Sequence, residues 1–393
     1  MIHAPTLVLL AAAALGLLAL ALQHLALRRH LAEPPPTPEA RPGISVLKPL
    51  CGADDGLREN LACFADLDWP EYEVLLGVRD AGDAAWPVAL AAARRWPGRF
   101  RVVLQRGEPG WNPKVNQLVT LAREARHDIL VVSDSNVRVG RGYLAEIAGH
   151  LEDPGVGLVT HPIAGVGERR LGSLFENLHM GAGIAPAVVG AKRLAGRDLV
   201  IGKSMALRRR DLAALGGFES VKDVLAEDYV MGARVSRQLG KRVALCSTPV
   251  ENVSQGRRLS DFTGRYLRWA VMQRRIAGTA AYAAMALMNP VLLALLACLL
   301  EPDGRVLGAA AAVAAGKAML DGASARRLRP GGFAAWQLAL VPLKDLCFAW
   351  SWARGLLEDE VVWRGNRLRV LAGSALQPAA SPRAASASGD APA

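Results

Sequence analysis

Disulfide and zinc-finger patterns are absent from this chain of 393 residues. Its cysteines are odd in number, and no two of them form a Cys-x-x-Cys pair; they are Cys51, Cys63, Cys246, Cys298 and Cys347. A secreted disulfide scaffold needs paired cysteines, and a structural zinc site commonly shows closely spaced ones. We therefore expect a protein of a reducing compartment that has no zinc site.

Charge is absent from the first part of the chain. Residues 2–27 contain no Lys, Arg, Asp or Glu, and 7–27 are long enough to cross about 30 Å of hydrocarbon as a helix. A cleaved signal peptide carries its basic residues before a shorter apolar run, whereas Arg28 and Arg29 follow this one. Residues 1–30 are therefore predicted to form a retained transmembrane anchor whose C-terminal end lies in the cytoplasm.

Acidic residues are outnumbered, with 36 Asp and Glu against 47 Lys and Arg and a formal net charge of +11. Such an excess can indicate nucleic-acid binding. In this sequence the basic clusters lie beside or between apolar runs, at 28–29, 257–258, 274–275, 326–327 and 364–369. Anionic lipid headgroups occupy the same boundary, so we expect a membrane as partner and no nucleic acid.

Internal repeats are also absent, and a polar, proline-rich linker at 31–42 leads into an alternating segment at 43–258. The predicted strands are 44–47, 72–78, 100–104, 128–133 and 157–160, and the predicted helices are 57–65, 84–95, 114–123 and 142–151. This alternation is typical of an α/β domain with a mainly parallel, Rossmann-like sheet. Such sheets bind ligands beyond the carboxyl ends of their strands.

The composition changes after residue 258. Arginines and aromatic residues share 259–276, the pattern of a helix lying in the membrane interface. A C-terminal membrane region is predicted at 277–371, with 277–300 long enough to span and 306–320 as a return pass.

A further apolar stretch at 333–357 is interrupted by Lys344 and Asp345. A single pass there would place the basic residues 364–369 outside, so a re-entrant or two-pass hairpin is predicted. The Ala/Ser/Pro-rich tail at 372–393 is predicted to be disordered.

Three carboxylates, Asp80, Asp134 and Asp228, each follow an apolar segment of the alternating domain. Asp134 and Asn136 offer oxygen ligands to a Mg²⁺ or Mn²⁺ ion, which would bridge phosphate oxygens. An Asp-Ser turn that closes a strand gives the same pattern, and Asp80 alone is a weaker signal. We expect the metal at Asp134 and Asn136, and a substrate-binding role for Asp80.

Charged residues at predicted helix starts extend this polar set. Lys114 can present a point charge to phosphate, although an ordinary surface lysine looks the same in the sequence. Glu227 and Asp228 open a helix-like stretch, where acids also complement the helix dipole. As a general base, Asp228 needs to reach a hydroxyl group while it is ionised near neutral pH.

An Arg265-Tyr266-Leu267-Arg268-Trp269 segment comes next to the apolar C-terminal region. Arginines at such a boundary also occur as simple interfacial cations. Displacement of a nucleoside diphosphate from a sugar requires a grip on the nucleoside, neutralisation of the diphosphate, and a base for the acceptor hydroxyl. Three carboxylates followed by Arg-x-x-Arg-Trp beside a membrane therefore favour a sugar-nucleotide transferase that works on lipid.

Six motifs carry a family likeness over 43–369: Lys48-Pro49-Leu50 with Gly52, Trp69-Pro70-x-Tyr72-Glu73, Asn112-Pro113-Lys114, Asp134-Ser135, Glu227-Asp228 and Arg265-x-x-Arg268-Trp269. Together they resemble the ceramide glucosyltransferases, a branch of the inverting GT-A glycosyltransferases. The resemblance implies a GT-A fold for 43–258, Asp80 at the nucleotide and Asp134 at metal and diphosphate. It also implies Asp228 as catalytic base, with Arg265, Arg268 and Trp269 closing the site at the membrane.

The expected function is transfer of a hexose, glucose, from a UDP-sugar to a ceramide-like lipid, with inversion. The expected location is the bacterial inner membrane, crossed several times, with the catalytic domain in the cytoplasm. Hopanoid and diacylglycerol acceptors stay open, because a bacterial relative of this family acts on hopanoids. A processive polysaccharide synthase would need more membrane helices than the sequence contains, and the retained carboxylates and arginines disfavour an inactive scaffold.

Overall fold

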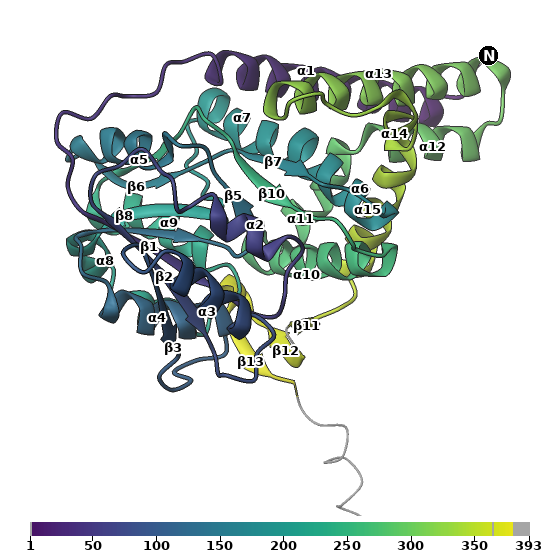
Figure 1. The fold of residues 1–393 in the computed structure, drawn as a ribbon. Coiled ribbons are helices and arrows are strands. Elements are labelled where there is room, and N and C mark those ends of the chain that lie inside the picture. Colours follow the sequence, from purple (N-terminus) through teal and green to yellow (C-terminus); the bar gives the residue numbers. More distant parts are fainter. Residues whose placement is uncertain (1, 364, 380–393) are drawn as a thin grey trace, which may run out of the picture.

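Seven strands form the central sheet of the computed structural model, which describes residues 2–363 and 365–379 (Figure 1). Their order is β3-β2-β1-β4-β8-β6-β9, and β8 runs antiparallel to both of its neighbours. The strands are β1 (Ile44–Pro49), β2 (Tyr72–Val78), β3 (Phe100–Leu104), β4 (Ile129–Ser133), β6 (Val156–Thr160), β8 (Ser204–Arg208) and β9 (Arg242–Leu245). The mainly parallel α/β sheet is confirmed, whereas β8 and β9 are absent from the predicted set.

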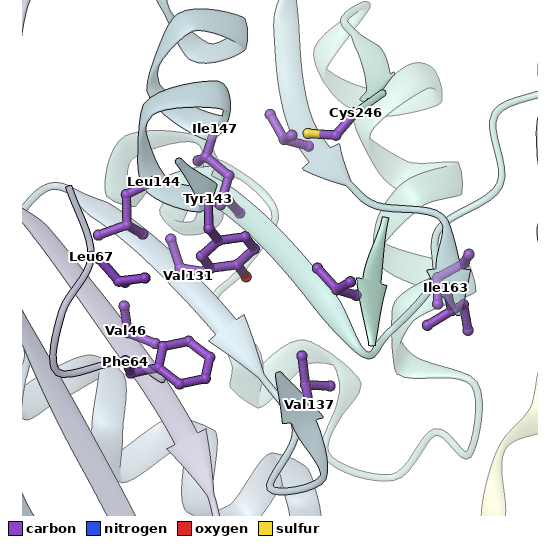
Figure 2. Packing of buried hydrophobic residues seen from close by; sticks show 14 of the residues in the cluster. Val46, Phe64, Leu67, Val131, Val137, Tyr143, Leu144, Ile147, Ile163 and Cys246 are labelled. Atoms are coloured by element: carbon purple, nitrogen blue, oxygen red, sulfur yellow. The ribbon is translucent and has the colours of Figure 1, made fainter. Parts of the chain in front are cut away.

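Helices cover both faces of this sheet, which explains why β1, β2, β4 and β6 are buried along their whole length. One face carries α4 (Pro113–Glu124), α8 (Arg209–Ala214) and α9 (Glu227–Leu239); the other carries α2 (Leu57–Ala62), α3 (Trp86–Arg95), α5 (Tyr143–Glu152) and α7 (Ala185–Ala195). Leu118 and Met231 belong to the first core. Figure 2 shows part of the second, where Phe64 and Tyr143 pack with Val131.

A second, small sheet lies in the order β5-β10-β7. Its strands are β5 (Val137–Arg138), β7 (Ile163–Val166) and β10 (Val250–Val253). It packs beside α6 (Leu171–His179), which continues through a π-helical turn at Met180–Ile184 into α7. Strands this short carry too few residues for a period-2 pattern, which is why the sequence analysis does not find them.

Within the described residues, two helices are individually long and apolar enough to cross a membrane, α1 (Ala4–His30) and α13 (Gly304–Leu328). The stretch 277–300, expected to span, is bent by 82°: it consists of α11 (Thr279–Ala284), a 3₁₀ turn at Met285–Met288, and α12 (Pro290–Leu300), and it is apolar enough to cross a membrane only as one broken span. Pro290 causes the break, because it lacks an N–H and disfavours helical dihedrals at Asn289, whose φ and ψ are −111° and 82°.

The helices α1, α12 and α13 pack together with an acidic end and a basic end. At the acidic end the backbone N–H of His3 donates to Glu301. At the other end the His24 ring lies 3.0 Å from Ser324 Oγ, next to Arg28 and Arg327. This segregation of charge agrees with the orientation predicted for the anchor.

Lys344 and Asp345 lie on α15 (Val341–Gly355), which follows the short α14 (Ala335–Ala339). Their charges meet those of Lys317 and Asp321 on α13, and we call these four residues the helix cluster. Lys344 Nζ is 3.0 Å from Asp321 Oδ2 and 2.8 Å from Asp345 Oδ1, and Lys317 also pairs with Asp321. The charges that interrupt the apolar pattern thus neutralise one another between two helices.

The helix α10 (Leu259–Ala277) lies between α6 and α15. Phe262 and Tyr266, which favoured an interfacial helix, are buried against Phe175 and Phe348. Its aromatic face therefore packs inside the protein, because α6 and α15 cover it, and membrane contact by this helix stays a prediction.

The C-terminal strands change two predicted boundaries: the end of the membrane region at 371 and the start of the disordered tail at 372. A third sheet contains β11 (Glu360–Trp363), β12 (Asn366–Val370) and β13 (Leu376–Pro378), and it packs against α10 rather than among the membrane helices. The backbone of 374–376 also bonds to Asp223 and Leu225. The tail predicted to be disordered is therefore ordered over 372–379, since strand pairing satisfies its backbone; 380–393 lie outside the described residues.

Candidate active site

A cavity of about 1350 Å³ lies beyond the carboxyl ends of β1 and β4, where a parallel sheet binds ligands. One end is polar and is lined by Arg79, Lys114 and Asp134. The other end is lined by aromatic side chains of the C-terminal helices, including Phe348 and Trp352. The cavity therefore joins a charged region of the α/β domain to the C-terminal helices α10 and α15.

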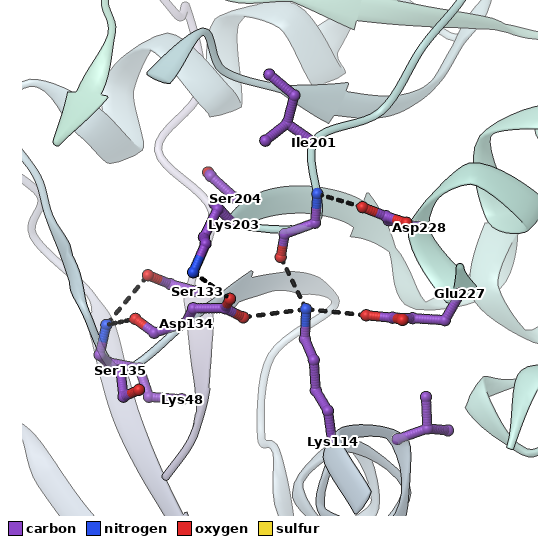
Figure 3. Close-up of polar contacts among 12 residues, drawn as sticks. Lys48, Lys114, Ser133, Asp134, Ser135, Ile201, Lys203, Ser204, Glu227 and Asp228 are labelled. Carbon is purple, nitrogen blue, oxygen red and sulfur yellow. Dashed lines mark hydrogen bonds and ion pairs between the residues drawn. The ribbon is translucent and has the colours of Figure 1, made fainter. Parts of the chain in front are cut away.

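Five charged residues, which we call the site cluster, surround the polar end (Figure 3): Lys114, Asp134, Lys203, Glu227 and Asp228. Lys114 Nζ lies 3.0 Å from Asp134 Oδ1 and 2.9 Å from Glu227 Oε1. Lys203 Nζ lies 3.0 Å from Asp134 Oδ2. Burial alone would raise the pKa of Asp134, but the two ammonium groups hold it well below its usual value.

Local sequence fixes the position of Lys114. Asn112 caps α4 by accepting from the backbone N–H groups of Lys114 and Val115, and Pro113 occupies the first helical position. The amide nitrogen of Asn112 donates to Val224 O and to Glu227. One side chain therefore joins the start of α4 to the start of α9, which brings Lys114 and Glu227 together.

Asp228 is held by two backbone N–H groups. Its Oδ2 accepts from Gly202 at 2.7 Å, and its Oδ1 accepts from Tyr229 at 2.8 Å. Burial and the neighbouring Glu227 carboxylate raise the pKa of Asp228 to about 6, against the opposing effect of Lys114. A half-buried carboxyl group with this pKa is ionised at neutral pH and can accept a proton.

Lys48 lies next to Asp134 but is fully buried. Its Nζ donates to Ser133 Oγ at 3.1 Å and to the carbonyl of Asp134 at 2.9 Å, and it lies 3.9 Å from the centre of the Phe64 ring. Burial lowers the pKa of Lys48 to about 7. These contacts fix the backbone at Asp134, so Lys48 orients the carboxylate rather than lining the cavity.

The predicted metal ligands differ in their surroundings. Asp134 offers the hard oxygen atoms that Mg²⁺ and Mn²⁺ prefer, but each of them is paired with an ammonium group, which a metal ion would have to displace. Asn136 is buried, and its Oδ1 accepts from Lys203 while its amide donates to Asn252 and Val253. Asp134 is therefore the residue through which a metal ion would be held.

Arg265 and Arg268 line the cavity but have different partners. Arg265 pairs at 2.9 Å with Glu176 of α6, a fully buried carboxylate. The Arg268 guanidinium lies 6.0 Å from the centre of the Trp363 ring of β11. Trp269 contacts the Tyr266 ring, at 5.3 Å between ring centres, and lines the aromatic end of the cavity.

The structure brings together all but one of the predicted site residues. Asp80 follows β2 but is 62% exposed and does not line the cavity, whereas its neighbour Arg79 does. The sequence analysis missed Lys203, which comes just before β8, and Glu176. A prediction of β8 beside β4 would have placed Lys203 opposite Asp134.

Comparison with known protein families shows to which family the chain belongs. The profile of Glycosyl transferase family 21 matches residues 7–376. The chain belongs to this family. Ceramide glucosyltransferase 3 of Caenorhabditis elegans is 28% identical over 238 residues, which is 59% of this chain and 50% of that protein. Ceramide glucosyltransferase 1 of the same organism is 28% identical over 242 residues, 61% of this chain and 51% of that protein.

These matches confirm the resemblance seen in the sequence motifs, and the chain spans about half the length of the curated relatives it matches. Among solved structures, a Pyrobaculum calidifontis mannosyltransferase in complex with GDP-Man and Mn²⁺ has 21% identity and a TM-score of 0.48, covering 89% of this chain and 99% of that chain. Mycobacterium tuberculosis glucosyl-3-phosphoglycerate synthase with phosphoglyceric acid has 17% identity and a TM-score of 0.39, covering 65% and 88%. Neither similarity identifies the donor or metal of this chain.

Proposed function

We propose that the protein is a membrane-bound inverting glycosyltransferase, which moves glucose from UDP-glucose to the hydroxyl group of a ceramide-like lipid. The continuity of the cavity carries this proposal, because one space holds a charged end suited to a sugar nucleotide and an aromatic end suited to a lipid. Membership of family 21 and the names of its relatives support the same activity.

Asp228 is the proposed catalytic base. It takes the proton of the lipid hydroxyl while that oxygen bonds to the anomeric carbon of glucose, and the bond from that carbon to the diphosphate oxygen breaks. The two backbone N–H groups from Gly202 and Tyr229 fix the carboxylate during this step. Attack from the face opposite the leaving UDP inverts the anomeric carbon.

The negative charge of the departing UDP meets Lys114, Lys203 and Arg268. These cations lie in the same cavity as Asp228, and Arg79, which follows β2, lines it as well. The predicted contact of Asp80 with the nucleotide would require its exposed side chain to turn toward the cavity. A Mg²⁺ or Mn²⁺ ion held by Asp134 would neutralise the diphosphate further. We propose Arg265 as a positioning residue, because its guanidinium is already paired with Glu176.

The proposed setting is the bacterial inner membrane, with the α/β domain in the cytoplasm. Four arginines lie in the last turns of α1 and α13, at the end of the helices opposite Glu301: Arg28, Arg29, Arg326 and Arg327. Positive charge at cytoplasmic ends orients membrane helices. In this orientation the aromatic end of the cavity lies next to the lipid from which the acceptor comes.

A transfer assay with defined lipids tests the proposal. The full chain is reconstituted in liposomes containing ceramide, diacylglycerol or a hopanoid, and UDP-glucose, UDP-galactose or UDP-N-acetylglucosamine is added with and without a chelator. Mass spectrometry of the lipids should show one glucose on ceramide, with loss of product in chelator. A hopanoid or diacylglycerol product would establish another acceptor, a lengthening polymer would establish a processive synthase, and no glycolipid at all would contradict the proposal.

A further inference from the structure

A second group of side chains with metal-ligating atoms lies outside the lining of the cavity, where α1 meets the α/β domain. Glu146 and His150 are one turn apart on α5, and Cys246 directly follows β9. One ligand atom from each of these three side chains lies within 4.8 Å of the other two. They are distant in the sequence, which is why cysteine spacing led to the expectation of no zinc site.

Glu146 carries an unusual unpartnered atom. Its Oε1 accepts from the backbone N–H of Ser247 at 2.6 Å and from the Ser247 hydroxyl at 3.0 Å. Its Oε2 is buried and has no hydrogen-bond partner among the described residues. The residue is only 3% exposed, so bulk water does not supply one. A buried carboxylate oxygen without a partner is costly, so a ligand at this atom has a physical reason to bind.

His161 stands beside the same turn of α5. Its ring lies 4.9 Å from that of Tyr143, and its Nδ1 contacts Ser204 Oγ at 2.9 Å. Its Nε2 is likewise buried and without a partner in the described part of the chain. Two orphaned polar atoms therefore lie on α5 and on the loop packed against it.

We propose that Glu146, His150 and Cys246 bind one Zn²⁺ ion. A carboxylate, an imidazole and a thiolate are the ligands that zinc prefers, and tetrahedral bonds of about 2.0–2.3 Å place them roughly 3.5 Å apart. The ligand atoms now lie within 4.8 Å of one another, so the ion would draw them closer together. The hydrogen bonds from Ser247 to Oε1 orient the carboxylate so that Oε2 faces the ion, as partners of metal ligands commonly do.

The ion would stabilise the docking of the membrane anchor. His30, at the end of α1, contacts the carbonyl oxygen of Cys246 through Nε2 at 2.8 Å, and its Nδ1 faces Arg193 of α7. Zinc would hold the 246–248 loop to α5 directly beside this contact. The role is structural, and it is independent of the transfer reaction.

Metal analysis of the full chain, purified in detergent without chelator, tests this site. We expect about one zinc per chain, and a near-complete loss in His150→Ala and Cys246→Ser. His150 is half-exposed on a helix, so its variant keeps the fold even where Cys246→Ser does not. The matched controls His127→Ala and Cys298→Ser should keep the metal.

Cobalt substitution provides the second readout. Co²⁺ in the parent should show the thiolate charge-transfer absorption of a tetrahedral site, which Cys246→Ser abolishes and Cys298→Ser retains. Absence of both zinc and the cobalt band in the folded parent would overturn the proposal, and so would zinc content unchanged in His150→Ala.

Discussion

The site cluster and the helix cluster are both sets of buried lysines and carboxylates, yet they differ in access. In the site cluster the side chains of Lys114 and Asp134 are 17% and 22% exposed, and they line the cavity. In the helix cluster Lys344 and Asp321 are 1% and 3% exposed and lie between α13 and α15. The same chemistry is open to a ligand in one place and closed in the other.

This difference indicates what each cluster does. Charges that face a cavity can exchange one partner for another, so Lys114 and Lys203 can leave Asp134 for a diphosphate. Charges sealed between helices have no alternative partner, so removal of one leaves the others buried and uncompensated. The open cluster is therefore expected to control the rate of transfer, and the closed cluster the stability of the fold.

The largest expected effect is that of Asp228→Asn. The amide cannot take the hydroxyl proton, so transfer should fall about 10²–10⁴-fold while UDP-glucose binding changes little. Initial rates in liposomes and donor titration measure the two quantities. The matched control is Asp66→Asn, an exposed carboxylate paired with Arg141, which should keep the parental rate. A rate within tenfold of the parent would remove Asp228 from the role of base.

Asp321→Asn should show the opposite profile. It leaves Lys317 and Lys344 with one carboxylate between them, and an uncompensated buried charge costs about 3–5 kcal/mol of unfolding free energy. Denaturant unfolding in detergent measures the loss, and transfer by the folded fraction should stay close to that of the parent.

Replacement of a whole pair sharpens this prediction. Lys317→Met combined with Asp321→Leu removes one charge of each sign and leaves Lys344 paired with Asp345. Apolar substitutes for a buried ion pair are often neutral, so the double variant should recover most of the stability lost in Asp321→Asn. A double variant less stable than Asp321→Asn would mean that packing, not charge balance, dominates there.

Arg268→Lys tests whether the planar shape of the arginine side chain or only its charge matters in the cavity. A lysine cannot reproduce a planar contact with phosphate or with the Trp363 ring, so we expect a loss of transfer of about tenfold or more. Arg258 is exposed at the start of α10, and Arg258→Lys should have a small effect because membrane attraction needs only charge. Membrane fractionation of both variants excludes a loss of anchoring. Equal small effects would show that Arg268 is an ordinary interfacial cation.

The smallest effect at neutral pH is expected from titration of Asp228. Its pKa is raised to about 6, so the carboxylate is ionised above pH 6 and gains a proton below it. Because the base acts in its ionised form, transfer should be nearly constant from pH 7 to 8 and should fall about tenfold per pH unit well below pH 6. A rate that stays flat down to pH 5 would contradict this assignment.

The sequence predicts the fold best where each segment signals its own structure. β2 and β3 match their predicted bounds because short, mainly apolar runs alternate there with helix-like stretches. β8 escapes prediction because pairing with β4 and β6, rather than local sequence, makes 204–208 a strand. Pro290 is a sequence signal for the bend at Asn289, but the lack of charge over 277–300 favoured a single span.

The site shows the same limit. The order of motifs identifies Lys114, Asp134, Glu227 and Asp228, which the structure places in one cluster. Lys203 carries no sequence signal of its own and becomes relevant only because β8 lies beside β4. The helix cluster was visible only as an interruption by Lys344 and Asp345, since their partners lie about 25 residues earlier on another helix.

The most direct measurement compares Asp228→Asn and Asp321→Asn for both transfer rate and unfolding free energy. The account predicts a crossed result: Asp228→Asn loses rate but remains within about 1 kcal/mol of the parental stability, because its amide keeps one of two hydrogen bonds. Asp321→Asn loses stability but keeps the rate per folded molecule. If both variants lost transfer rate, or both lost unfolding free energy, the division between an open catalytic cluster and a closed structural one would be wrong.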